Sequence, residues 1–479
     1  MDAALKLDKA GEQQSPKKHP PGLYLLFFTE AWERFSYYGM RGLLVLYLTT
    51  SLVSGGLGFD KAVAVQIYGI FTMLVYFTPI IGGWLTDHFI TKRHAITIGG
   101  IIMAIGNFVL FSMNTKTGLF LGLGLLVIGN GFFKPNISTL LGQLYSENDS
   151  RRDSAFTIFY MGINLGALIA PFICGYFADY RYGFLTACIG MIIGQLAFNF
   201  LAPRYLGSIG TTVVGKKSKE KNAKVIEKKP LTTQEKKRTA AILILTCFVV
   251  FFWAGFEQAG SSLTLYTDKF VDRTIGGFTI PTPWFQSVNP LFIILLALPV
   301  SALWIKLSKT KNGDLKIPTK MAFGMILLGI GYLVLTLAVL KTGSDEGNIT
   351  MKANLLFIVF TYMFHTIGEL FLSPIGLSMV SAIAPVKLAS LLMGVWLAGT
   401  GFANLLAGQL AAFTQSLGYL EVFASIGIIV IVLGLVLLMF SKKIAHMMEK
   451  QKDASQLRSV FFIISPLKLS RPHERSHQD

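Results

Sequence analysis

The sequence predicts an all-α integral membrane protein, and three observations support this fold class. Hydrophobic residues make up 52% of the 479 residues and charged residues only 14%, which is far more apolar than a soluble domain. The apolar residues fall into about twelve stretches, each long enough to cross a hydrocarbon core that needs roughly 20 helical residues. Because only helices and closed barrels satisfy their backbone hydrogen bonds in lipid, we expect each stretch to be a membrane helix.

The expected helices follow one another along the chain in two sets of six. They cover residues 23–50, 62–86, 95–113, 117–143, 155–178 and 183–203, and then residues 239–266, 284–305, 320–340, 354–382, 389–413 and 420–441. A Lys-rich segment with few large apolar residues separates the two sets. We therefore expect five regions: a cytoplasmic tail (1–22), a six-helix bundle (23–203), a cytoplasmic linker (204–238), a second six-helix bundle (239–447) and a cytoplasmic tail (448–479). Two such bundles typically hold a substrate between them at the bilayer midplane.

The distribution of Lys and Arg predicts the orientation of the chain, because cationic loops stay on the cytoplasmic side during insertion. The cations fall in alternate loops, which places both termini in the cytoplasm of a multi-pass protein of a plasma membrane or a bacterial inner membrane. The formal net charge of +17 is then explained by topology and attraction to lipid headgroups, and we expect no nucleic-acid partner.

Cys174, Cys188 and Cys247 all lie inside predicted helices, so neither a disulfide framework nor a metal site is expected.

The first expected helix carries an unusual number of charges. Each Arg, Lys or Asp at a helix centre costs about 2.5–3.5 kcal/mol on insertion, so such residues persist only where partners or water compensate. The polar residues of this helix follow the spacing i, i+3, i+4, i+7, i+8, i+11: Glu30, Glu33, Arg34, Tyr37, Tyr38 and Arg41. This spacing places them on one helix face, which we expect to line a water-filled cavity. The alternative is a closed salt-bridge cluster that only packs helices.

Single ionisable residues occur in other expected helices: Lys134, Glu257, and Glu369 with His365 one turn before it. If these groups converge on the first helix, carboxylates and cations are nearly balanced and one added proton neutralises the set. Carboxylates that gain and lose cationic partners in such a site can couple to a proton gradient, and a zwitterionic substrate also fits. A purely structural role is the alternative for Glu257 and Glu369, and we interpret His365 as a hydrogen-bonded packing residue.

Several motifs resemble those of the proton-dependent oligopeptide transporters of the major facilitator superfamily. The resemblance extends from Tyr24 to about Met448. The segment EAWERF at 30–35 is similar to the ExxERF element of that family, and GFFKPN at 131–136 and FYMGIN at 159–164 are similar to its two signature segments. Further matches are GGWLTD at 82–87, FEQAGSSL at 256–263, QSVNP at 286–290, GELFLSPIGLS at 368–378 and GVW at 394–396.

The resemblance implies the major facilitator fold and proton-coupled symport of di- and tripeptides by alternating access, without a cofactor. It assigns Arg34, Arg41 and Lys134 to the peptide carboxylate, and Glu369, Asn164 and Asn289 to the amino end. The implied cavity-wall residues are Tyr37, Tyr38, Tyr68, Tyr160 and Trp396. The implied proton-coupling and gating residues are Glu30, Glu33, Arg34 and Glu257.

Some features depart from the family pattern, and other functions stay open. Animal members carry a proton-linked His in the second helix where this chain has Gly69. Many bacterial members insert a helical hairpin between the two halves, for which the 204–238 linker has no room. Animal members also have a large outer domain between the ninth and tenth helices, and the short loop at that place here favours a microbial source. Related carriers move nitrate, single amino acids or modified small molecules, and a peptide sensor without transport is a further alternative. A membrane-embedded enzyme is not expected, because the helices contain neither HExxH nor GxSxG. We expect a monomer whose partners are peptide, protons and lipid.

Overall fold

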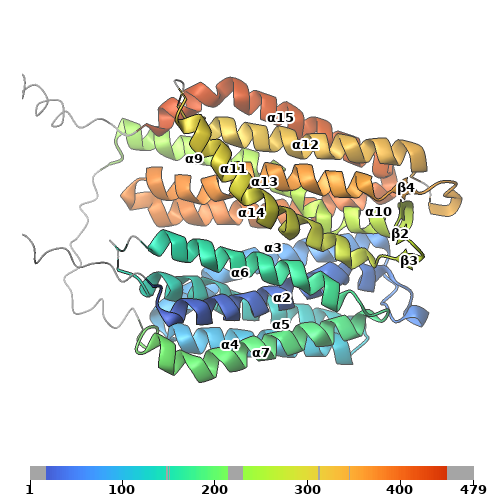
Figure 1. Cartoon of the computed structure of the whole chain (residues 1–479), viewed down its shortest axis with the longest axis horizontal. Helices are drawn as coiled ribbons and strands as arrows, with labels where there is room; N and C mark the ends of the chain where they lie inside the picture. The colour runs from blue at the N-terminus through green and yellow to red at the C-terminus, as the bar shows by residue number, and fades with distance from the viewer. Residues whose placement is uncertain are drawn as a thin grey trace, which may run out of the picture.

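The structure is a computed structural model of the chain that describes residues 18–146, 149, 151–213, 230–310, 313–344 and 346–449. The first 17 residues of the predicted N-terminal tail lie outside the described residues, as do 214–229 of the predicted linker and 450–479 of the predicted C-terminal tail. The described part is a set of long helices that run roughly along one direction, as Figure 1 shows.

The first half of the chain forms six long helices, which lie in the lower part of Figure 1. They are α2 (Pro21–Thr49), α3 (Lys61–His88), α4 (Lys92–Ser112), α5 (Lys116–Gln143), α6 (Arg152–Cys174) and α7 (Tyr180–Leu206), with a short 3₁₀ turn, η2 (Leu52–Ser54), after α2. Their buried side chains make one hydrophobic core, which Leu265 and Ala411 from the second half also join. We call this set the first bundle.

The second half forms a second set, the second bundle, with its own hydrophobic core. Its helices are α9 (Thr233–Phe256), α10 (Ser262–Phe270), α11 (Val288–Ser308), α12 (Ile317–Thr342), α13 (Leu356–Ile383), α14 (Ala389–Leu417) and α15 (Tyr419–Met448). The 3₁₀ segments are η3 (Glu257–Gly260), η4 (Thr282–Ser287), η5 (Glu346–Asn348) and η6 (Val386–Leu388). Strand β1 (Val271–Asp272) pairs in parallel with β4 (Ala353–Asn354), and β2 (Thr274–Ile275) pairs antiparallel with β3 (Phe278–Thr279).

Eleven helical segments in the described residues are long and apolar enough to cross a membrane. Together with α2, which carries the charged residues of the first predicted helix, they coincide with the twelve predicted spans. The seventh span differs from the prediction in one respect. It is not a continuous helix, because α9 ends at Phe256 and the chain continues through η3 before α10 begins. The break lies where Gly260 approaches α3 so closely that a Cβ there would overlap the Tyr68 hydroxyl.

The two bundles meet closely at the end that carries the four short strands, at the right of Figure 1, which we call the outer end because the loop charges predict that it faces outside. Helix α3 packs along α14, and η4 packs on α6. Gln66 of α3 donates a hydrogen bond to Gln409 of α14 at 3.1 Å, and the Ser287 hydroxyl donates to the Leu168 carbonyl at 2.7 Å. These contacts close the space between the bundles at the outer end.

Candidate functional site

A cavity of about 400 Å³ lies between the two bundles. Its volume is in the range of sites that enclose small organic molecules. Helices α2, α3, α5 and α6 line one wall, and α9, η3, α11, α13 and α14 line the other. Nine of the residues predicted from the sequence lie on its surface: Tyr38, Arg41, Lys134, Tyr160, Asn164, Glu257, Asn289, Glu369 and Trp396.

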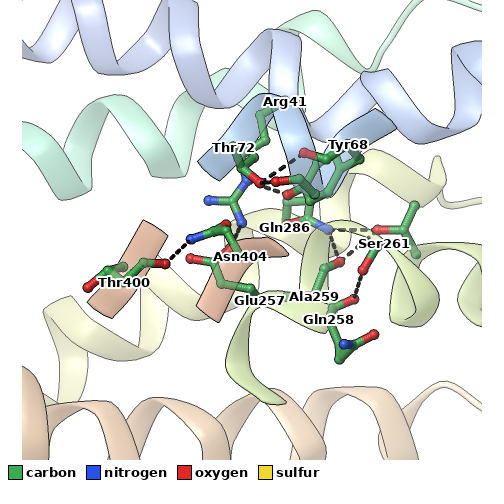
Figure 2. Close-up of polar contacts among 12 residues, drawn as sticks. Arg41, Tyr68, Thr72, Glu257, Gln258, Ala259, Ser261, Gln286, Thr400 and Asn404 are labelled. Atoms are coloured by element: carbon green, nitrogen blue, oxygen red, sulfur yellow. Dashed lines mark hydrogen bonds and ion pairs between the residues drawn. The ribbon is translucent and has the colours of Figure 1, made fainter. Parts of the chain in front are cut away.

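Arg41 of α2 forms an ion pair across the cavity with Glu257 of η3. The side chains of Arg41 and Glu257 are 13% and 5% exposed. Figure 2 shows Arg41 between Glu257 and Tyr68, whose hydroxyl accepts a hydrogen bond from Arg41 Nε at 2.5 Å. The guanidinium also lies over the rings of Tyr38 and Tyr68, a favourable cation–π arrangement. The pair therefore joins the two bundles through a buried charge contact that a proton on Glu257 would break.

Glu257 lies at the break in the seventh span. It is the first residue of η3 and follows directly on α9. Its backbone keeps helical dihedral angles, and η3 contacts α2, the helix that carries Arg41. Gln286 holds this segment by donating a hydrogen bond to the Ala259 carbonyl at 2.5 Å (Figure 2) and a second one to the Thr264 hydroxyl at 2.8 Å. Discontinuous helices of this kind commonly form the substrate and ion sites of transporters.

Lys134 supplies the second cation of the first-bundle wall. It lies in the middle of α5, directly before Pro135, and its ammonium group is 4.5 Å from the centre of the Tyr76 ring. Within the described residues Lys134 forms no ion pair. Arg41 and Lys134 thus give this wall two positive charges, of which one is already paired with Glu257 and the other can receive an anionic group of a ligand.

The opposite wall carries the carboxylate of Glu369 from α13. Asn289 of α11 donates a hydrogen bond to Glu369 Oε2 at 2.9 Å and a second one to the Thr366 hydroxyl at 3.0 Å. Asn164 of α6 also lines the cavity, and its side-chain amide donates to the Tyr160 carbonyl at 3.0 Å. A carboxylate on one wall and cations on the other suit a ligand that has an ammonium group at one end and a carboxylate at the other.

Glu30, Glu33 and Arg34 lie inside the first bundle and are not among the cavity-lining residues. Arg34 Nε lies 3.0 Å from Glu30 Oε1 and 2.5 Å from Glu33 Oε2. The predicted polar face of the first helix is thus divided, and only Tyr38 and Arg41 reach the cavity. The reason is the packing of α6, since a Cβ on Gly166 would lie 3.0 Å from Arg34 Cβ. Helix α6 therefore covers the part of α2 that holds the buried cluster of three charges.

Two of the predicted wall residues lie elsewhere. Tyr37 is buried beside Tyr38, and Tyr68 lies behind Arg41 as its hydrogen-bond partner; neither is among the cavity-lining residues. The tyrosine of α3 that does line the cavity is Tyr76, two turns further along the same helix. Sequence reasoning also missed further residues of the wall: Trp253, Phe256, Gln286 and Tyr362. Only charge distinguishes a cavity residue in an apolar helix, and these side chains carry none.

His365 is buried at the edge of the cavity. Its ring packs on Tyr332 of α12 with 4.8 Å between ring centres. Gly331 makes room for it, because a Cβ there would lie 2.6 Å from His365 Cδ2. The position against α12 is that of a packing residue, but the predicted hydrogen bonds of its ring nitrogens are not seen within the described residues.

Comparisons with known proteins agree with this geometry. A family model described as the POT family matches residues 93–207 and 208–426. An uncharacterized transporter of Bacillus subtilis (strain 168), YclF, is 35% identical over 478 residues, which cover 90% of this chain and 95% of that protein. A di-/tripeptide transporter of Lactococcus lactis subsp. cremoris is 32% identical over 487 residues, covering 90% and 96%. A crystal structure of a mutant peptide transporter POT in complex with alafosfalin superimposes with a TM-score of 0.83 at 33% identity, covering 91% of this chain and 98% of that one.

Proposed function

Because the chain belongs to the POT family of transporters, we propose that it carries di- and tripeptides into the cell together with protons. Membership of this family confirms the resemblance seen in the motifs and the predicted fold class, an all-α multi-pass membrane protein with the major facilitator fold. The name of the Lactococcus relative, a di-/tripeptide transporter, supports peptides as the substrate class for this chain.

The observation that carries the proposal is the distribution of charge in the cavity. A short peptide is a zwitterion, so its carboxylate can bind Arg41 and Lys134 while its ammonium group binds Glu369. Asn289 lies on the same wall as Glu369 and Asn164 on the facing wall, and each provides a side-chain amide oxygen for the ammonium group. Aromatic residues on both walls, among them Tyr76 and Trp396, surround the middle of the cavity, where the peptide side chains would lie.

The proposed coupling step is the loss of the ion pair between Arg41 and Glu257. A proton that enters from outside and binds the Glu257 carboxylate neutralises it and frees Arg41 for the peptide carboxylate. The bundles then rock about the cavity, and peptide and proton leave on the inner side. Glu30 and Glu33 are a second candidate for the proton, because both share Arg34. In this proposal the protein works as a monomer in a bacterial inner membrane or a plasma membrane, with both termini in the cytoplasm and without a cofactor.

The proposal is tested by uptake of labelled dialanine into proteoliposomes. Accumulation is compared under an acid-outside, inside-negative gradient, without a gradient, and with a protonophore. Peptide–proton symport requires accumulation that depends on the gradient and is abolished by the protonophore. Folded protein that does not accumulate dialanine would contradict the proposal, and competition with nitrate and with single amino acids would then identify another solute. Binding of dialanine without proton flux would indicate a sensor.

A further inference from the structure

Asn130 of α5 contacts the buried acid Glu33. Its Nδ2 lies 3.4 Å from Glu33 Oε1, and the two residues are 1% and 0% exposed. Lys134, which lines the cavity, follows Asn130 by one helical turn on α5. One face of α5 therefore contacts both the cavity and the buried carboxylate of α2.

The two oxygens of Glu33 have different partners. Oε2 lies 2.5 Å from Arg34 Nε, whereas Oε1 faces the neutral amide of Asn130. The charged groups that face Glu33 are Glu30 and Arg34 from its own helix and Lys134 from α5. Arg34 also forms an ion pair with Glu30, so one guanidinium group pairs with two carboxylates.

Asn130 is the neighbour that can hydrogen-bond Glu33 both when Glu33 is ionised and when it is protonated. Arg and Lys carry only donors, whereas an amide has a donor and an acceptor on the same group. In the structure the Asn130 amide nitrogen donates a hydrogen bond to the Glu33 carboxylate. The amide oxygen, Oδ1, is buried and has no hydrogen-bond partner within the part of the chain that the structure describes. A half turn of the amide would present this oxygen to the O–H of a protonated Glu33.

We propose that Asn130 is a positioning residue for the proton on Glu33, hydrogen-bonding the carboxylate through its nitrogen and the carboxylic acid through its oxygen. The inference rests on the proposed proton symport, with Glu33 as a proton site in addition to Glu257. When a proton binds Glu33, one O–H bond forms and the ion pair with Arg34 is lost; when the proton leaves to the inside, the carboxylate returns to Arg34. Without Asn130 the protonated acid would lose its uncharged acceptor in a buried site, so proton loading would be impaired.

The test compares Asn130→Thr with Asn130→Val, because these side chains have the same shape and only the Thr hydroxyl donates and accepts hydrogen bonds. For each variant, gradient-driven accumulation of dialanine is measured beside counterflow, the exchange of labelled for unlabelled dialanine without a gradient. We expect Asn130→Val to lose about tenfold in accumulation while its counterflow stays within about twofold of wild type. Asn130→Thr should keep most of the accumulation.

Asn107→Val is the matched control. Asn107 is another buried asparagine of the first bundle, but it donates to the Ser36 hydroxyl at 3.1 Å and to the Met103 carbonyl of its own helix at 3.2 Å, and neither partner is a carboxylate. Its variant should keep the wild-type ratio of accumulation to counterflow. Ser and Ala at position 130 repeat the comparison with a smaller side chain, for the case in which the Val variant does not fold.

Three outcomes would overturn the inference. A wild-type ratio in Asn130→Val shows that the amide is not needed for coupling, and an equal change in Asn107→Val shows a general effect of losing a buried amide. In both cases the proposed symport still stands, because the wild-type protein accumulates dialanine. If the wild-type protein itself shows no gradient-driven accumulation, the proposed function fails and the role of Asn130 fails with it.

Discussion

Gly69 of α3 and Gly408 of α14 pack backbone against backbone across the two bundles. A Cβ placed on Gly69 would lie 2.8 Å from Gly408 Cα and 3.0 Å from the Asn404 carbonyl oxygen. In proteins a Cβ atom essentially never lies less than 3.0 Å from a heavy atom of another residue in this way. The two helices can therefore reach their observed separation only because both positions lack a side chain.

We predict that Gly69→Ala stops the outer end from closing fully and lowers the initial rate of dialanine uptake by about tenfold or more. The variant should still fold, because the added methyl lies between the bundles and not within the core of either one. The matched control is Gly124→Ala on α5, where a Cβ would meet no atom within 4 Å. Equal uptake by the Gly69 and Gly124 variants would show that the close packing of α3 on α14 is not needed for transport.

A second contact holds the outer end together. Lys61, the first residue of α3, forms an ion pair with Glu346 of η5, and the two side chains are 24% and 31% exposed. Partly exposed pairs contribute up to about 1 kcal/mol and are screened by salt. We expect Lys61→Glu or Glu346→Lys to slow dialanine uptake by about two- to fivefold at low ionic strength.

The double variant, with both charges exchanged, checks this assignment. It should restore the wild-type rate, and 1 M salt, at which the Debye length is about 3 Å, should reduce the differences among all four proteins. A double variant that is as slow as either single variant would mean that the two residues act independently.

The charged part of the site could be predicted from the sequence, because an ionisable residue in a membrane helix is energetically costly and usually has a functional role. Arg41, Lys134, Glu257 and Glu369 come from four different helices, and the structure brings them to one cavity. Their meeting could not be derived from periodicity, which describes one helix at a time. The family resemblance supplied that step.

The aromatic wall could not be predicted with the same success. Tyr68 and Tyr76 are two turns apart on α3, and periodicity places both on the same face. Which of them reaches the cavity depends on the tilt of α3 and on the break at η3. At this break the missing side chain of Gly260 leaves room for the Tyr68 hydroxyl. The break has a signal that the prediction of one helix over 239–266 did not use, because the segment GFEQAGSS at 255–262 interrupts the apolar stretch with Gly, Ser and a charge. The position of Arg34 inside the first bundle similarly depends on α6, through the contact at Gly166.

The loop between α5 and α6 provides a prediction on pH. Hydrogen bonds from the Arg151 side chain, at 3.0 Å and 2.7 Å, hold the pKa of Asp149 at about 2, below its ordinary value of 3.8. Because the folded-state pKa is lowered, the stabilisation by this carboxylate is fully present above about pH 4 and is lost as the pH falls towards 2.

Asp149→Asn should therefore lower the thermal unfolding temperature in detergent by a small and equal amount at pH 7 and pH 5. The difference between variant and wild type should shrink between pH 4 and pH 2, where the wild-type carboxyl gains its proton. An unfolding-temperature difference that stays constant down to pH 2 would show that the carboxylate charge is not the source of the stabilisation.

Glu257→Gln tests the coupling step itself. The amide has the shape of a protonated Glu257 and cannot form the ion pair with Arg41, so the variant should resemble a permanently protonated transporter. Gradient-driven accumulation of dialanine should be abolished, whereas counterflow should persist, because exchange requires the bundles to rock but requires no change in protonation. Glu421→Gln is the control, since Glu421 is an exposed carboxylate in the first turn of α15 and does not line the cavity. Full concentrative uptake by Glu257→Gln would rule this residue out as the coupling site and would leave the Glu30 and Glu33 pair, with Asn130 beside it, as the place where the proton binds.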